Sequence, residues 1–293
     1  MSAKILLVGD NPFHGVSHLS QERVRARDEK IVDPAWAAEI VKTSIENGAN
    51  GFMFSVSETT LAIIKRFDHP HLNLRYYAIV PAAGDYVRLS SKLGTVGLVK
   101  YVAGQIIKSG NFAATINGTK GVLLNDVNSL LKAYLGYEIS RINHALNNGH
   151  KLYSLMLHEL MTEMAIALDM DWIIRTHIEF LKDHGIKPGL ETRNFQCLVN
   201  KLSKWGINTS DIVITAPFNK LGYQMSPSKV ECEQSLKSLP EAEVIAMSVL
   251  ASGRLKLSEA QDYLNYIPEL KGAVIGTSSR EQAKETFGFF RRE

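Results

Sequence analysis

The segment GDNPFHGVSHLS, which directly follows the apolar run KILLV, concentrates residues that can do chemistry. It contains Asp10, Asn11, His14 and His18. Imidazole groups exchange protons near neutral pH, and carboxylate and amide groups hydrogen-bond to polar ligands. We therefore take His14 as a candidate catalytic residue and Asp10, Asn11 and His18 as candidate substrate-binding residues. In a purely structural alternative, Asp10 and Asn11 only build a turn and the two histidines only pack.

Two later apolar runs also end in ionisable residues. His158 and Glu159 follow one run, and Glu191 and Arg193 follow another. We expect His158 and Glu191 to act as catalytic acid–base groups and Glu159 and Arg193 to contact substrate. The structural alternatives are a packed histidine and a Glu191–Arg193 ion pair. A further alternative makes His14, His158, Glu159 and Glu191 the ligands of a divalent metal, because separate strand ends can supply nitrogen and carboxylate ligands.

The segment GTSSRE near the C-terminus has the composition of an anion site. Gly276, Ser278, Ser279 and Arg280 stand where an apolar run gives way to a helical pattern. The free N–H groups and the positive dipole end of a helix N-terminus attract anions. Phosphate binding and simple capping of the helix by Ser278 or Ser279 are both consistent with this pattern.

Short apolar runs alternate with helical patterns along the chain. Strands are expected at 4–9, 51–56, 74–82, 150–159, 187–192, 211–218, 243–250 and 272–278, and helices at 34–48, 57–67, 162–185, 194–206, 230–239, 258–267 and 279–290. This alternation predicts an α/β fold, a closed (β/α)8 TIM barrel. The competing open, doubly wound sheet would need a glycine-rich turn after the first strand, which residues 9–12 do not provide. Barrel active sites lie at the C-terminal ends of the strands, where the candidate residues stand.

One segment interrupts the alternation between the third and fourth strands. Helical patterns occupy 92–110 and 128–149, and we expect the second to be the regular barrel helix. Residues 84–126 are then a helical insertion within a single domain that spans 1–293. Such long connections are commonly functional, so the insertion is expected to form a lid or the contact surface of a homo-oligomer.

Composition and charge limit the classes of partner. With 33 basic and 30 acidic residues the net charge is +3, which argues against nucleic acid or an anionic membrane surface as partner. No apolar stretch is long enough to span a membrane, and no signal peptide precedes the first strand, so we expect a cytoplasmic protein with a small-molecule substrate. Cys197 and Cys232 have no metal-ligand spacing and are expected as reduced thiols.

In this layout the sequence resembles the aldo/keto reductase superfamily, best over 150–290. Asn194-Phe195 and Phe218-Asn219 match residues after the family's fifth and sixth strands, and the ASGRL turn after Ser248 matches its pyrophosphate turn. The resemblance implies NADP or NAD as cofactor, with Arg280 favouring NADP and Asn194 holding the nicotinamide amide. The cofactor-binding residues that it implies are Asn194, Asn219, Ser248, Leu250, Gly253, Gly276, Ser278, Ser279 and Arg280.

The N-terminal half departs from the family. Of its catalytic Asp, Tyr, Lys and His, only the histidine has a match here, His158. The resemblance therefore implies an oxidoreductase for a small carbonyl or sugar-like substrate with an atypical site, in which His14 and His158 replace the missing groups. The alternatives are a metal- or phosphate-dependent lyase or isomerase, and a non-catalytic binding protein on the same barrel.

Overall fold

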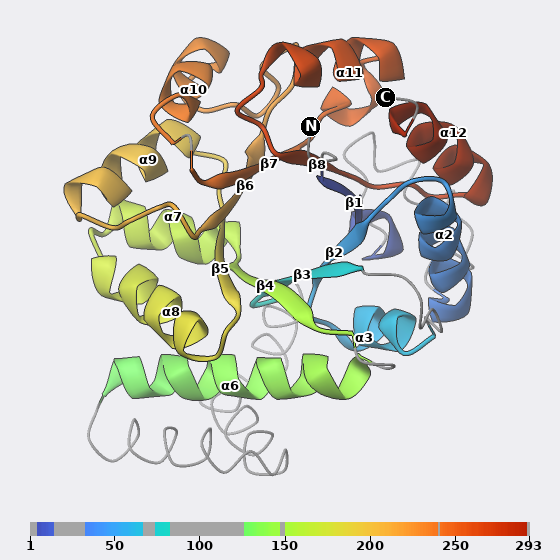
Figure 1. The fold of residues 1–293 in the computed structure, drawn as a ribbon. Coiled ribbons are helices and arrows are strands. Elements are labelled where there is room, and N and C mark those ends of the chain that lie inside the picture. Colours follow the sequence, from blue (N-terminus) through green and yellow to red (C-terminus); the bar gives the residue numbers. More distant parts are fainter. Residues whose placement is uncertain are drawn as a thin grey trace.

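The computed structural model describes residues 5–14, 33–66, 74–82, 126–146, 150–239 and 241–291. Eight parallel strands close into a barrel in chain order, with β8 paired to β1 (Figure 1). The strands are β1 (Ile5–Gly9), β2 (Gly51–Ser55), β3 (Arg75–Val80), β4 (Leu152–Leu157), β5 (Lys187–Glu191), β6 (Val213–Pro217), β7 (Glu243–Met247) and β8 (Gly272–Ile275). The predicted (β/α)8 barrel is therefore confirmed.

Helices surround this barrel. They are α2 (Pro34–Glu46), α3 (Glu58–Ile64), α6 (Val127–Ala145), α7 (Glu159–Ala167), α8 (Asp171–Asp183), α9 (Phe195–Lys204), α10 (Lys229–Leu236), α11 (Leu257–Tyr266) and α12 (Arg280–Phe290), with 3-10 turns η1 (Asn11–His14) and η3 (Ala251–Gly253). As expected, α6 is the regular helix between β3 and β4. Except for Asp126, which caps α6, the insertion expected at 84–126 lies outside the described residues. Within the described part of the chain, every helix is too short or too polar to cross a bilayer.

The prediction of one long helix over 162–185 is wrong. Two helices, α7 and α8, occupy this region, and α7 already begins directly after β4. The chain reverses at Asp169, whose φ is 54°, and aspartate is one of the few residues that adopt this left-handed conformation readily. Lys201 and Trp205 hold its carboxylate at 2.6 and 3.0 Å. The helical periodicity of the sequence continues across the break and so does not reveal it.

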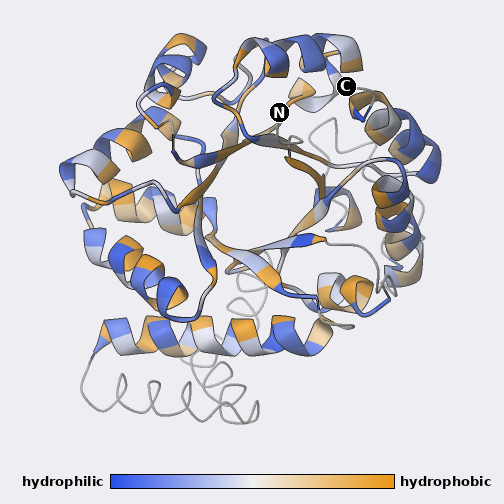
Figure 2. Ribbon diagram, viewed as in Figure 1, coloured by the Kyte–Doolittle hydropathy of each residue, from blue (hydrophilic) through white to orange (hydrophobic). Residues whose placement is uncertain are grey.

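Two apolar cores result from the alternation of side chains along each strand. One core fills the space between strands and helices, and β1 contributes Leu6 and Val8 to it. The other fills the barrel interior and contains Ile5, Leu7, Met53, Tyr77, Ile79, Met156, Val213 and Ile245. In Figure 2 hydrophobic residues are frequent in most of the strands, β5 being an exception, and the surrounding helices mix hydrophobic and hydrophilic residues. The packed interior makes the barrel a rigid frame for the residues at its two ends.

A largely buried polar cluster lies at the N-terminal end of the barrel. The Glu243 carboxylate at the start of β7 accepts hydrogen bonds from Tyr77 (2.9 Å), Tyr153 (2.7 Å) and Lys187 (3.0 Å). Burial and the Glu243 carboxylate raise the pKa of Tyr77 and of Tyr153, so both hydroxyls remain protonated donors. Four strands are thereby joined at the end opposite the candidate site.

Candidate functional site

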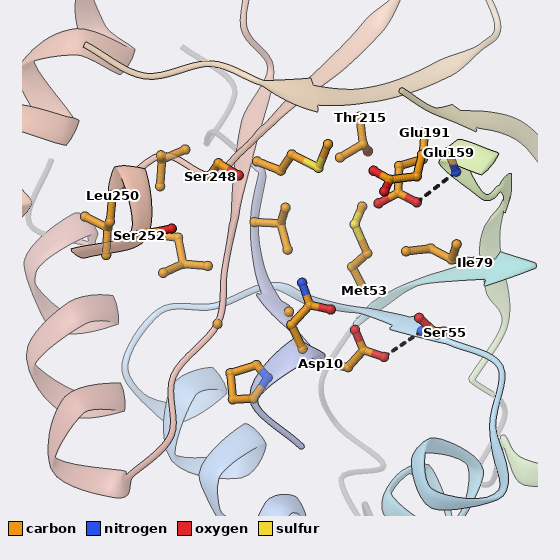
Figure 3. Close-up of a pocket in the computed structure, with 18 of the residues that line it drawn as sticks. Asp10, Met53, Ser55, Ile79, Glu159, Glu191, Thr215, Ser248, Leu250 and Ser252 are labelled. Carbon is orange, nitrogen blue, oxygen red and sulfur yellow. Dashed lines mark hydrogen bonds between the residues drawn. The ribbon is translucent and has the colours of Figure 1, made fainter. Parts of the chain in front are cut away.

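A cavity of about 480 Å³ opens at the C-terminal ends of the strands (Figure 3). Its volume lies within the roughly 300–1,000 Å³ typical of small-molecule sites. Most of the predicted site residues line it, namely Asp10, Asn11, His158, Glu159, Glu191, Arg193, Ser248, Leu250, Gly253, Gly276 and Ser278. The cavity has an acid–base end near β4 and β5 and a second end near the turns that follow β7 and β8.

Glu191, the last residue of β5, is the central group of the acid–base end. Burial and the neighbouring Glu159 carboxylate raise its pKa to about 7. One of its oxygens accepts a hydrogen bond from the backbone N–H of Glu159 at 3.2 Å, and the two side chains lie together in Figure 3. The Glu159 carboxylate forms an ion pair with Arg193 Nε at 2.6 Å. A carboxyl group with a pKa near 7 can both donate and accept a proton under physiological conditions.

His158 stands next to this group at the end of β4. It is the N-cap of α7, and its Nδ1 accepts a hydrogen bond from the Leu160 backbone N–H at 3.1 Å. Because Nδ1 is the acceptor, the proton of the neutral imidazole resides on Nε2. Burial lowers the pKa of His158, which favours this neutral form. His158 therefore offers a fixed N–H donor to a ligand in the cavity.

Asp10 organises the loop after β1. It is 4% exposed, and its Oδ2 accepts hydrogen bonds from the Ser55 backbone N–H (2.7 Å) and from His14 Nε2 (2.9 Å). The turn predicted as the structural alternative is present as η1. His14 pairs with Asp10 and is not among the residues that line the cavity, whereas His18 lies outside the described residues. Asp10 thus lines the cavity, whereas His14 contacts Asp10 and does not line the cavity.

The second end of the cavity is built from turns with unusual backbone conformations. Ser248, Ala251, Ser252 and Gly253 all have positive φ, between 46° and 77°. Non-glycine residues rarely adopt such values, and they concentrate at functional sites. Gly276 has no room for a side chain, because a Cβ would lie 2.9 Å from ring atoms of Pro12. The β1 loop and the end of β8 therefore pack closely at this wall.

The α12 N-terminus is capped by its own residues. Ser279 Oγ accepts from the Gln282 backbone N–H, and Gln282 Oε1 accepts from both the N–H (2.9 Å) and the hydroxyl (3.2 Å) of Ser278. Ser278 and Gln282 line the cavity. Ser279 and Arg280 do not, and the Arg280 guanidinium lies over the Trp36 ring at 5.3 Å. Ser279 therefore caps the helix, as the alternative to phosphate binding predicted, and Arg280 does not line the cavity.

Asn194 and Asn219 are also absent from the cavity wall. Asn194 donates to Glu163 (2.6 Å) and accepts from Ser226 (2.8 Å). The fully buried Asn219 bonds through both ends of its amide to the backbone of Tyr223, at 2.8 and 2.9 Å. Both side chains hold loops in place, so neither has the free amide that the family resemblance implied.

Two residues that sequence reasoning missed organise the site. The Glu163 carboxylate accepts from the Thr192 hydroxyl and the backbone N–H groups of Arg193 and Asn194, at 2.7, 2.9 and 3.2 Å. Gln224 Oε1 accepts from Arg193 and from Ser248. No sequence pattern marks either residue, because each acts on partners in other loops. By contrast, the spacing of Ser279 and Gln282 is that of a capping box.

The metal-ligand alternative is not supported by the geometry. In the described portion of the chain, His, Cys, Asp and Glu residues form no group of three or more that could hold a metal ion. The expected set of His14, His158, Glu159 and Glu191 is therefore not assembled. His14 is directed to Asp10, and Glu159 is directed to Arg193.

These features define a (β/α)8 barrel with a polar cavity where barrel enzymes have their active sites. Among solved structures, the chain is similar to a presumed aldo-keto reductase from Pseudomonas aeruginosa, with a TM-score of 0.56 at 12% identity over 98% of this chain and 89% of that one. Another structure, described as Gox0644 in its apo form, has a TM-score of 0.53 at 9% identity over 97% of this chain and 83% of that one. No protein-family model and no curated protein matches the sequence. The chain thus has the fold of the aldo-keto reductases, as the resemblance implied.

Proposed function

We propose that this protein is an NAD(P)-linked oxidoreductase that acts on the carbonyl group of a small polar molecule. The observation that carries the proposal is the single cavity that joins Glu191 and His158 to the turns after β7 and β8. A cavity with proton-transfer groups at one end and a cradle of turns at the other suits a ligand pair of reactive carbonyl and extended cofactor.

The second end of the cavity fits a dinucleotide through neutral donors. The Ser252 hydroxyl and the Gln282 side-chain amide line this end, and the hydroxyls of Ser248 and Ser278, which now donate to Gln224 and Gln282, could turn to a cofactor when it binds. Such groups, with backbone N–H groups at a helix N-terminus, are suited to phosphate oxygens. Because Asn194 and Asn219 face away, the nicotinamide would contact other residues than those of the family pattern.

The mechanism assigns proton transfer to this chain's own residues. The cofactor would supply the hydride to the carbonyl carbon. The His158 Nε2–H would donate a hydrogen bond to the carbonyl oxygen, and protonated Glu191 would transfer its proton to that oxygen to complete the alcohol. Glu191 leaves the reaction as a carboxylate and recovers its proton from solvent. In the oxidation direction the carboxylate accepts the proton.

Titration with NADPH and with NADH tests the proposal through nicotinamide fluorescence. We expect saturable binding of at least one cofactor, and weakened binding in Ser252→Glu, because the new carboxylate would repel the diphosphate. Ser238→Glu, which adds the same charge on an exposed residue outside the cavity, is the matched control. Absence of binding at high micromolar concentrations of both cofactors would reject the NAD(P)-linked function.

A second candidate function is an isomerase or lyase that uses proton transfer alone. It is favoured by the raised pKa of Glu191 together with the engagement of Asn194 and Asn219 elsewhere. Such an enzyme would exchange the hydrogen on the carbon next to a carbonyl with D₂O without nicotinamide cofactor. Exchange without cofactor would support this function, and cofactor-dependent reduction without exchange would support the first.

The variant His158→Asn separates the capping role of His158 from its role in the cavity. Asparagine is a good N-cap, so we expect the melting temperature to stay close to that of the wild type. The imidazole N–H donor is lost, so turnover should fall by about 10²-fold or more. His158→Ala loses both roles and serves as the comparison. Full turnover in His158→Asn would show that the histidine only caps α7.

A further inference from the structure

We propose that Gln224 is a positioning residue that couples the two ends of the cavity. Its side-chain oxygen accepts from Arg193 Nη1 at 2.5 Å and from the Ser248 hydroxyl at 3.1 Å. Arg193 belongs to the acid–base end, and Ser248 begins the turn after β7. One carbonyl oxygen, with two lone pairs for two donors, therefore joins the loops that follow β5 and β7.

The backbone around Gln224 is held rigidly for this contact. Gln224 has a φ of 61°, a left-handed conformation that is costly for a residue with a long side chain. Asn219 binds the backbone of Tyr223 immediately before it, and the Ser226 hydroxyl bonds to Asn194 just after it. A strained residue fixed on both sides is typical of a position that the fold holds for function.

From Gln224 the contacts continue to the acid–base group. Arg193 is held by Gln224 through Nη1 and by Glu159 through Nε, and the Glu159 N–H binds Glu191. The charged and titratable groups that act on Glu191 are Glu159 on α7, Asp10 after β1 and Arg193 in its own loop. His158 is adjacent at the end of β4. Displacement of Arg193 would therefore change the proton affinity of Glu191.

The coupling links two binding events, that of a proton to Glu191 and that of a dinucleotide, and the second of these rests on the proposed function. A dinucleotide that engages Ser248 would leave Gln224 bound to Arg193 alone and change how firmly that guanidinium is held. Because linkage is reciprocal, the protonation state of Glu191 would in turn change cofactor affinity. Binding of the cofactor would thus change the pKa of Glu191, the acid group of the cavity.

The isosteric variant Gln224→Met tests the proposal in the ligand-free protein. Methionine has a similar length and adds no charge, so a change at Glu191 would reflect the release of Arg193. We expect the titration midpoint of Glu191, followed by ¹³C NMR of its carboxyl group, to rise by about half a pH unit or more. Gln282→Met, the same change at a glutamine that lines the cavity but does not contact Arg193, should leave the midpoint unchanged. An unchanged midpoint in Gln224→Met would overturn the inference.

A second variant covers the case in which Gln224→Met does not fold. Gln224→Glu keeps an oxygen acceptor for both donors, so the ¹⁵N-edited Nη1–H signal of Arg193, the group that Gln224 binds, should stay protected from solvent exchange. Its loss would overturn the inference. Cofactor binding is measured separately in each variant. A shifted midpoint without binding of either NADPH or NADH upholds the positioning role and rejects the oxidoreductase. Binding of one of these cofactors with an unchanged midpoint upholds the oxidoreductase and rejects the positioning role.

Discussion

Glu191→Gln should abolish most of the activity and still make the protein more stable at pH 8. Glutamine fills the same space but cannot transfer a proton, and loss of a positioned acid–base group costs about 10²–10⁴-fold in rate. The gain in stability follows from the cost of holding a carboxylate in this position. Burial and the Glu159 carboxylate raise the pKa of Glu191 from its ordinary 4.5 to about 7.

The sign of the effect on stability is set by proton linkage. A carboxyl group whose folded-state pKa is raised favours the folded state below its unfolded pKa and loses that contribution as pH rises through about 7. Above pH 7 the variant is spared a cost of about 3 kcal/mol, which corresponds to the shift of the Glu191 pKa from 4.5 to about 7. Urea unfolding of both proteins at pH 5 and pH 8 measures this difference, which should be large only at pH 8. Glu241→Gln, on an exposed residue, is the control.

The same titration sets the pH dependence of turnover. Reduction requires protonated Glu191, so its kcat/KM should fall as pH rises through about 7, and oxidation should show the opposite trend. Equal unfolding free energies at pH 8, together with full activity in Glu191→Gln, would remove Glu191 from the proposed mechanism.

The fold could be predicted because its signals are local. Each strand is a short apolar run, each helix has its own periodicity, and caps such as Ser57 mark helix starts. Strict alternation then leaves few topologies, since parallel strands need helical crossovers. The break at Asp169 escaped prediction because a single left-handed residue, held by Lys201 and Trp205 from another helix, interrupts a pattern that otherwise continues.

For the candidate site, the sequence predicts which residues lie at the strand ends but not how their side chains are oriented. The barrel brings the C-terminal ends of its strands together, so His158, Glu191 and Asp10 could be placed at one cavity. Side-chain orientation was not readable, because it depends on partners from distant loops. Asn194 is turned away by Glu163, and Gln224 reaches Arg193 from a loop that no motif marks.

Glu243→Ala should be the most destabilising single change at the other end of the barrel. It removes the acceptor of Tyr77, Tyr153 and Lys187 at once and leaves a partly buried ammonium group without its partner. Breaking a fully buried ion pair costs about 3–5 kcal/mol, so for this partly exposed pair, with two tyrosine hydrogen bonds lost as well, we expect about 2–4 kcal/mol. The double variant Glu243→Leu with Lys187→Met removes both charges and should recover much of the loss, because no unpaired ion remains. Urea unfolding measures both effects.

Turnover distinguishes this cluster from the candidate site. The Glu243 cluster lies at the N-terminal ends of the strands, where barrel residues serve stability, so folded Glu243→Ala protein should keep its kcat. Glu191→Gln should show the opposite combination, with stability gained and turnover lost. If Glu243→Ala lost less than about 1 kcal/mol, the cluster would be no stronger than a surface ion pair. If it lost turnover while remaining folded, the division of the barrel into a stabilising end and a reactive end would be wrong.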